Sequence, residues 1–139
     1  MNSSLRPQVL IVEDEPAIAR VFARFLRTSG FDPVTASAGS IALGLLSAQR
    51  WDAVVIDLHL ANGPDGDEVI RLATARDPGL PARTIFTTGD LRPEGAERVA
   101  RLRCSASLAK PFPAAHLIEV VRQVVERDRV RAAEGRRRA

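Results

Sequence analysis

Short apolar runs alternate with segments of helical periodicity along the chain, and this alternation is the feature that most constrains the fold. The apolar runs cover residues 8–12, 32–37, 53–60, 84–89 and 106–109. Between and after them, apolar residues recur every three or four positions over residues 16–29, 40–49, 66–76, 93–102 and from 113 onward. This pattern is typical of an α/β protein with a parallel sheet covered on both faces. We therefore expect five strands and five helices, with 32–37 near an edge.

Composition bounds the number of domains and the compartment. The 139 residues are 45% hydrophobic and 27% charged, which suits one globular core. No apolar stretch approaches the length that spans a bilayer, and the first residues carry no signal-peptide pattern. The single cysteine, Cys104, excludes an internal disulfide and fits a reducing compartment. We therefore expect a cytoplasmic protein with no membrane partner.

Positive charge is concentrated at the end of the sequence. Residues 127–139 hold six arginines against Asp128 and Glu134, a net charge of +4, whereas the whole chain carries +3. The preceding part is almost neutral, and no DNA-binding module follows Phe112. Nucleic acid is therefore not an expected partner. We expect a folded domain over residues 1–126 and a basic, frayed or disordered tail over 127–139.

Polar residues gather where the predicted strands end, which is where open parallel sheets bind ligands. These residues are Glu13, Asp14 and Glu15 after the first strand, Asp57 in the third, Thr87, Thr88 and Gly89 at the fourth, and Lys110 after the fifth. Clustered carboxylates repel unless a cation lies between them, and oxygen ligands favour Mg²⁺ or a similar hard ion. A carboxylate can also accept a phosphoryl group, whose charge a metal, a hydroxyl and an ammonium neutralise.

Lys110 is the one lysine among twenty basic residues. A compact ammonium on a flexible stem can enter a narrow acidic cleft, where a planar guanidinium needs more room. Pro111 follows directly, and an X–Pro bond lowers the cost of the cis form, which would aim Lys110 back into the site. The sequence therefore predicts Lys110 as the cation of this site.

Four segments together carry a resemblance to a known family: VLIVEDE, AVVIDLHL, TIFTTGD and SLAKPF. In this order they resemble the receiver domain of two-component response regulators, over about residues 8–126. The resemblance implies the flavodoxin-like (CheY-like) fold, a doubly wound five-stranded parallel sheet in the order 2-1-3-4-5 with five helices. The receiver domain would then occupy residues 1–126.

The resemblance also implies a metal site. Asp57 matches the phosphoacceptor and is a metal ligand as well. Asp14 matches the direct ligand of Mg²⁺ (or Mn²⁺), and Glu13 matches the acidic neighbour that acts through water. His59 matches the position whose backbone carbonyl binds the metal.

Further matches concern the bound phosphoryl group. Thr88 matches the switch hydroxyl because it directly precedes the small Gly89, and Lys110 matches the lysine that pairs with the phosphoryl group. His59 and Asp90 match positions whose side chains tune how long that group survives.

One departure concerns the switch. Ser107 stands where many relatives have an aromatic switch residue, so the usual movement of that ring together with the threonine is in doubt. The loop after Asp57 also lacks the usual proline and is one residue longer than common.

The resemblance implies a single-domain response regulator that is not a dedicated enzyme. It would take a phosphoryl group from a histidine kinase or a histidine phosphotransfer protein. It would then change its binding to an unknown protein target through the fourth helix, fifth strand and fifth helix, with a weak homodimer left open.

The same residues leave three alternatives to a single-domain response regulator. A pseudo-receiver interaction domain is supported by Ser107 alone, and a receiver fragment of a larger regulator fits the same residues. A phosphatase with an aspartyl intermediate would need a second carboxylate two residues after Asp57, where the chain has His59.

Overall fold

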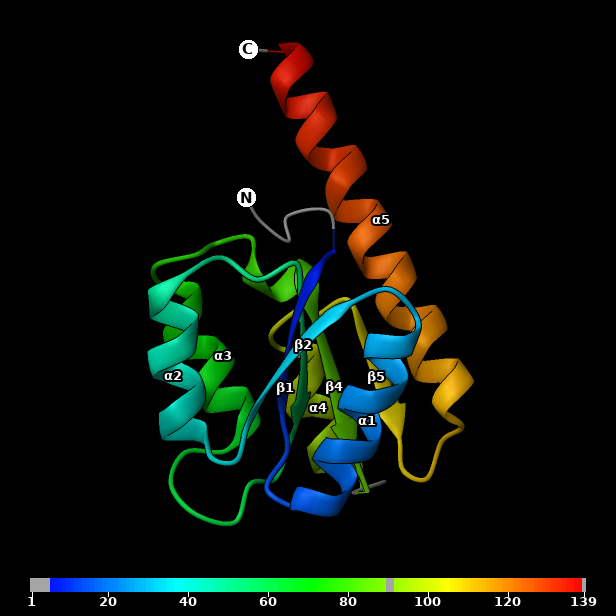
Figure 1. Cartoon of the computed structure of the whole chain (residues 1–139). Coiled ribbons are helices and arrows are strands. Elements are labelled where there is room, and N and C mark those ends of the chain that lie inside the picture. Colours follow the sequence, from blue (N-terminus) through cyan, green and yellow to red (C-terminus); the bar gives the residue numbers. More distant parts are fainter. Residues whose placement is uncertain (1–5, 90–91, 139) are drawn as a thin grey trace.

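The sheet has the predicted topology. The computed structural model describes residues 6–89 and 92–138 of the chain. Five parallel strands lie in the order β2-β1-β3-β4-β5 (Figure 1). Their bounds are β1 Gln8–Val12, β2 Asp32–Ala36, β3 Ala53–Asp57, β4 Thr84–Thr88 and β5 Ala106–Ala109. The order confirms the expected doubly wound fold and places β2 at an edge.

Helices cover both faces of the sheet. Their bounds are α1 Pro16–Thr28, α2 Gly39–Ala48, α3 Gly66–Thr74, α4 Pro93–Ala100 and α5 Ala114–Arg138, with a short 3₁₀ helix η2 at Leu80–Arg83. Residues of α2, α3 and α4 pack into one core cluster, and residues of α1 and α5 pack into a second on the other face (Figure 1). The five α-helices agree with the prediction.

The central strand β3 shows why its sequence is continuously apolar. All five of its residues are buried. Val54 and Ile56 point into the cluster beneath α2 and α3, whereas Ala53 and Val55 point into the cluster beneath α1 and α5. Successive side chains of a strand face opposite sides, so a strand covered on both faces needs apolar residues at every position.

The third strand ends earlier than its apolar run. The sequence predicts strand over 53–60, but β3 ends at Asp57. Leu58 still donates a backbone hydrogen bond to the Thr87 carbonyl oxygen (2.9 Å), after which the chain leaves the sheet. Leu58 and Leu60 nevertheless remain buried in the core. Burial in a loop, without strand pairing, therefore extends the apolar run.

The C-terminal segment forms one helix with the packed part, because α5 continues to Arg138, and the expected frayed or disordered tail over residues 127–139 stays a prediction. Arg50 Nη2 donates to both carboxylate oxygens of Asp128 (3.0 and 2.7 Å), which anchors the helix just after its packed part. Alanine, arginine and glutamate, which are strong helix formers, dominate the rest. Figure 1 shows this part of α5 extending past the body of the domain. The domain boundary at residue 126 stays a prediction.

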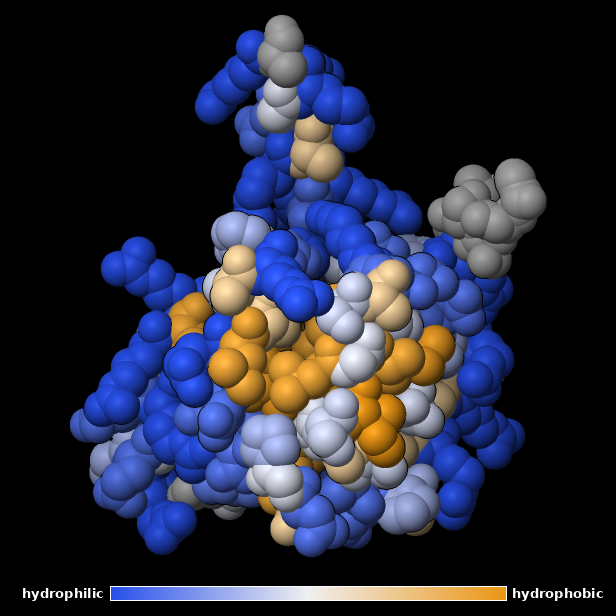
Figure 2. Space-filling model, turned by 90° about the vertical axis from the view of Figure 1, so that its left-hand side faces the viewer, coloured by the Kyte–Doolittle hydropathy of each residue, from blue (hydrophilic) through white to orange (hydrophobic). Residues whose placement is uncertain are grey.

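The outer surface of α2 is apolar. This helix has no charged residue, and Figure 2 shows apolar side chains gathered on the α2 and α3 side of the molecule. Ile41 and Leu72 are 48% and 45% exposed there. The patch stays at the surface because α2 packs only part of its circumference against the sheet and α3.

Within the described residues, no helix is both long and apolar enough to cross a bilayer. The long helix α5 is rich in charged residues.

Candidate functional site

Three carboxylates meet at the carboxyl edge of the sheet. Glu13 and Asp14 directly follow β1, and Asp57 closes the adjacent strand β3. One carboxylate oxygen of each lies within 4.8 Å of the others. Glu13 is 2% exposed and Asp57 is 7% exposed, so two of the three charges are withdrawn from water. The topology thus assembles the acidic cluster that the sequence predicts.

Lys110 reaches this cluster from the end of β5. Its Nζ donates to Asp57 Oδ2 (2.8 Å) and to Glu13 Oε1 (2.9 Å). Its backbone N–H donates to the Thr88 carbonyl oxygen (2.8 Å), which fixes the start of the side chain beside β4. The Lys110–Pro111 peptide bond is cis. The lysine therefore lies where the sequence analysis places it.

The charges of Glu13 and Lys110 depend on each other. Burial raises the pKa of Glu13, and the hydrogen bond from Lys110 partly offsets this rise. Burial acts to lower the pKa of Lys110, but hydrogen bonds to Asp57 and Glu13 outweigh it and raise the pKa above its ordinary value. Lys110 is therefore a permanent cation at neutral pH.

The loop of residues 58–65, called the β3–α3 loop below, directs backbone N–H groups at the cluster. His59 N–H donates to Asp57 Oδ1 (3.1 Å), and Ala61 N–H donates to Asp14 Oδ2 (2.7 Å). Gly66 follows the loop as the first residue of α3, and a Cβ there would lie 2.2 Å from the Asp57 carbonyl oxygen. Only glycine allows this close approach of the loop to the backbone of Asp57.

The cluster fits a hard divalent cation. Its donors are all carboxylate oxygens, the ligand type that Mg²⁺ and Mn²⁺ prefer. When ionised, the carboxylates of Glu13, Asp14 and Asp57 outnumber the single ammonium of Lys110 by two charges, which a divalent ion would balance. The His59 carbonyl stays a predicted ligand.

The end of β4 distinguishes the two threonines. Thr87 is 1% exposed and lies opposite Asp57 in the strand register, whereas Thr88 is only partly buried. Thr88 is thus the more accessible of the two, and its role as the switch hydroxyl stays a prediction. A Cβ at Gly89 would meet no atom within 4 Å, so space is open there. Asp90 lies outside the residues that the structure describes.

Ser107 lies beside an open cavity. The cavity has a volume of about 520 Å³ between α4 and β5, and both Thr88 and Ser107 line it. Ser107 is exposed, and its short side chain fills little of this space. One cavity is thus lined both by Thr88, the predicted switch residue, and by Ser107, which stands where many relatives have an aromatic residue.

Sequence reasoning missed the residues that support the β3–α3 loop. Asp65 accepts a backbone hydrogen bond within the loop, and Asp65 and Asp67 both pair with Arg98 of α4. The segment DGD (65–67) is a signal for the start of a helix. No spacing rule connects it to an arginine thirty residues later.

The sheet order together with the acidic cluster and the lysine at its carboxyl edge defines a flavodoxin-like receiver. Residues 9–122 match the response regulator receiver domain, and the chain belongs to this family.

Known proteins similar to the chain are longer regulators and receiver domains. Transcriptional regulatory protein PrrA of Mycobacterium bovis is 33% identical over 123 residues, which cover 87% of this chain and 51% of PrrA. DNA-binding response regulator MtrA of Mycolicibacterium smegmatis is 32% identical over 133 residues, covering 94% and 56%. The chain thus spans about half the length of these curated relatives.

A solved structure supports the fold. A CheY-like response regulator receiver domain protein of Methanospirillum hungatei superposes with a TM-score of 0.84 at 21% identity, covering 91% of this chain and 98% of that one.

Proposed function

We propose that the protein is a phosphorylation-controlled switch that accepts a phosphoryl group on Asp57. One observation carries the proposal: a buried strand-end carboxylate is held by an ammonium at 2.8 Å inside an acidic cluster. Two acidic neighbours and a lysine around one carboxylate suit phosphoryl transfer, where catalysis is mainly positioning and charge neutralisation. The expected donor is a histidine kinase or a histidine phosphotransfer protein.

In the transfer step, a carboxylate oxygen of Asp57 attacks the phosphorus of the donor's phosphohistidine. The new P–O bond forms as the P–N bond breaks, and the imidazole nitrogen leaves with the electron pair of that bond. Lys110, already on Asp57 Oδ2, pairs with a phosphoryl oxygen, and the Thr88 hydroxyl donates to another. A divalent cation held by Asp14, Asp57 and Glu13 supplies further charge neutralisation when bound.

The product is an acyl phosphate whose loss to water ends the signal. His59 and Asp90 are the residues that we expect to tune its lifetime. We propose a switch in preference to a phosphatase with an aspartyl intermediate, because the position two residues after Asp57 holds His59 in place of a second carboxylate.

We propose that the switched surface consists of α4, β5 and α5 and that it binds an unidentified protein target in the cytoplasm. The cavity lined by Thr88 and Ser107 lies on this side, between α4 and β5. The alternative of a receiver within a longer regulator is favoured by one observation, the half-length coverage of PrrA and MtrA.

The test is phosphorylation by acetyl phosphate with Mg²⁺, followed by intact mass. The parent should gain one phosphoryl group, and beryllofluoride with Mg²⁺ should change hydrogen exchange in α4 and β5. Asp52→Asn is the matched control for Asp57→Asn, because Asp52 directly precedes β3, the strand that Asp57 closes. A parent protein that neither gains the group nor responds to beryllofluoride would be a pseudo-receiver, which would overturn the proposal.

A further inference from the structure

Arg98 of α4 forms ion pairs with two aspartates beside the site, Asp65 and Asp67. Its Nε donates to Asp67 Oδ2 (2.8 Å), and its Nη2 donates to Asp67 Oδ1 (2.6 Å) and to Asp65 Oδ2 (3.1 Å). Asp67 belongs to the first turn of α3, and Asp65 is the last residue of the β3–α3 loop. One guanidinium therefore joins α4 to the loop and to the start of α3.

Asp65 connects these ion pairs to the interior of the β3–α3 loop. While its Oδ2 faces Arg98, its Oδ1 accepts the backbone N–H of Leu60 (3.1 Å). The neighbours of Leu60 on either side are His59 and Ala61, whose N–H groups bond to Asp57 and Asp14. A shift of Asp65 would therefore move two donors that orient the carboxylates of the site.

The ion pairs are partly sheltered from solvent. The side chains of Arg98, Asp67 and Asp65 are 28%, 23% and 36% exposed. The fork of arginine is rigid and meets Asp67 through two nitrogens, which fixes orientation as well as distance. By contrast, Arg101, the residue directly after α4, lies 3.9 Å from Glu97, with both side chains at least 70% exposed. An exposed pair of that kind contributes little.

We infer that Arg98 is a positioning residue for phosphoryl transfer, which through Asp65 and Asp67 ties α4 to the loop that orients Asp57 and Asp14. This inference rests on the proposed function and names how that site communicates with α4. The ring that usually couples the two is replaced by Ser107. In this chain the ion-pair cluster supplies a second route, and the phosphorylation state of Asp57 and the position of α4 influence each other through it.

The experiment compares Arg98→Gln with Arg101→Gln, a matched loss of charge at the residue directly after α4. In the metal-free protein, amide exchange measured by NMR at His59, Leu60 and Ala61 should be faster in Arg98→Gln and unchanged in Arg101→Gln. Phosphorylation by acetyl phosphate should slow roughly two- to thirtyfold in Arg98→Gln, the range that coupling residues show. The beryllofluoride-induced change in exchange of α4 should shrink by a similar factor.

Two further variants test the role of the Arg98 ion pairs independently of Arg98→Gln. Arg98→Lys keeps the charge but not the fork, and Asp67→Asn leaves Arg98 with Asp65 alone, so both should show intermediate losses even if Arg98→Gln folds poorly. Combining Arg98→Gln with Asp65→Asn should cost little beyond the larger single loss, since both break one pathway. Parent-like exchange and rates in Arg98→Gln and Arg98→Lys would overturn the inference, whereas an unlabelled parent would overturn the proposed function instead.

Discussion

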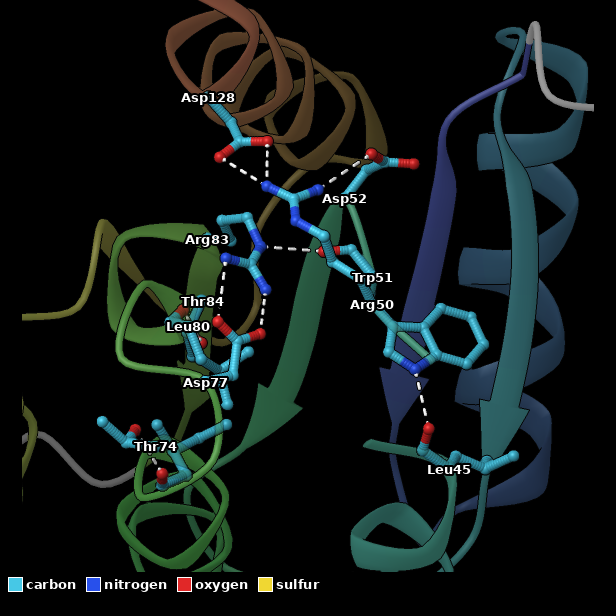
Figure 3. A network of polar contacts seen from close by, with 11 residues as sticks. Leu45, Arg50, Trp51, Asp52, Thr74, Asp77, Leu80, Arg83, Thr84 and Asp128 are labelled. Atoms are coloured by element: carbon cyan, nitrogen blue, oxygen red, sulfur yellow. Dashed lines mark hydrogen bonds and ion pairs between the residues drawn. The ribbon is translucent and has the colours of Figure 1, made fainter. Parts of the chain in front are cut away.

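The two ends of the sheet both hold charged side chains, but the contacts of these side chains differ. At the carboxyl edge, one flexible ammonium bridges Asp57 and Glu13 within a cluster that has excess negative charge. At the amino edge, arginines meet their aspartates in matched, many-point contacts (Figure 3). The first arrangement leaves charge for a ligand to balance, whereas in the second the Arg83–Asp77 pair balances its charge internally.

Arg83 shows the structural arrangement most clearly. It is 3% exposed, its Nε donates to the Trp51 carbonyl oxygen (2.8 Å), and both terminal nitrogens face Asp77. The indole of Trp51 in turn donates to the Leu45 carbonyl oxygen (3.0 Å) (Figure 3). Each of the three nitrogens that Figure 3 draws on Arg83 has an acceptor, so the guanidinium joins η2 to the segment before β3 and to the segment after α3.

Under the proposed function, the difference accounts for the single lysine of a chain rich in arginine. A guanidinium suits a site that must stay in one geometry, because its planar fork fixes several partners at once. An ammonium suits a site whose partner changes from carboxylate to phosphate, because its donors point in any direction around one atom. The comparison can be tested from both ends.

The largest effect is expected for Asp57→Asn. The variant should take up no phosphoryl group from acetyl phosphate and Mg²⁺, because the nucleophilic carboxylate is gone. Its free energy of unfolding should change by less than about 1 kcal/mol, since the amide relieves repulsion with Glu13 and Asp14. Intact mass and urea unfolding measure the two quantities. Asp77→Asn, the control at the amino edge, should be labelled like the parent, and labelled Asp57→Asn would refute the assignment.

A nearly complete loss of labelling is expected for Asp14→Ala. Removing this carboxylate should abolish Mg²⁺-dependent phosphorylation and leave the fold intact, because Asp14 is partly exposed and lies outside the core. Labelling with and without a chelator, together with a thermal melt, checks both parts. If a chelator left labelling of the parent unchanged, the metal site would be wrong.

Reciprocal exchanges of the two cations should have intermediate and opposite effects. Lys110→Arg should still acquire a phosphoryl group, perceptibly more slowly, but should lack the exchange response of α4, β5 and α5. Arg83→Lys should respond normally but lose about 2 kcal/mol of stability, because the Trp51 carbonyl and Asp77 lose buried partners. Hydrogen exchange and urea unfolding separate these outcomes. A Lys110→Arg protein that switches fully would show that charge alone is sufficient, provided that the parent shows a response.

The smallest effect concerns the cluster of Arg98 and Asp67, an arginine fork near the functional edge. Arg98 holds the pKa of Asp67 below its ordinary value of 3.8. Ionised Asp67 therefore stabilises the folded protein above that value, and the contribution disappears as the pH falls through the lower, folded pKa.

At pH 7, Asp67→Asn should accordingly be about 1 kcal/mol less stable than the parent, and the gap should close in acid. Urea unfolding across this pH range measures it. Glu97→Gln, which breaks the exposed pair with Arg101, is the control and should match the parent throughout. A gap that persists unchanged in acid would mean that packing, and not charge, stabilises this contact.

The fold was predictable because strand and helix patterns are local. β1 and β5 have the predicted bounds, and the polar residues that follow the strands meet because parallel strands end at one edge. Strand three was predicted three residues too long, because burial of Leu58 and Leu60 is indistinguishable from strand burial in the sequence. The roles assigned to Thr88, Lys110 and the metal ligands stay predictions.

The contacts that hold the site in place were not predictable. Arg98 meets Asp65 and Asp67 across more than thirty residues, and Arg83 meets the Trp51 carbonyl oxygen over a similar separation. Arginine occurs nineteen times, so no single one stands out by type, unlike the lone lysine. Likewise, the continuation of α5 depends in part on Arg50, which approaches Asp128 from a distant segment.

The unbroken course of α5 gives it the mechanics of a lever. Its first half rests on the sheet through Leu117, Val121 and Val124, close to the edge where Lys110 lies, and its second half projects from the opposite edge. With a rise of about 1.5 Å per residue, the part beyond residue 126 extends roughly 18 Å. A tilt of the packed half by about ten degrees would carry the far end roughly 3 Å sideways, given that length. Arg50, which pairs with Asp128, lies beside the beginning of this projecting part.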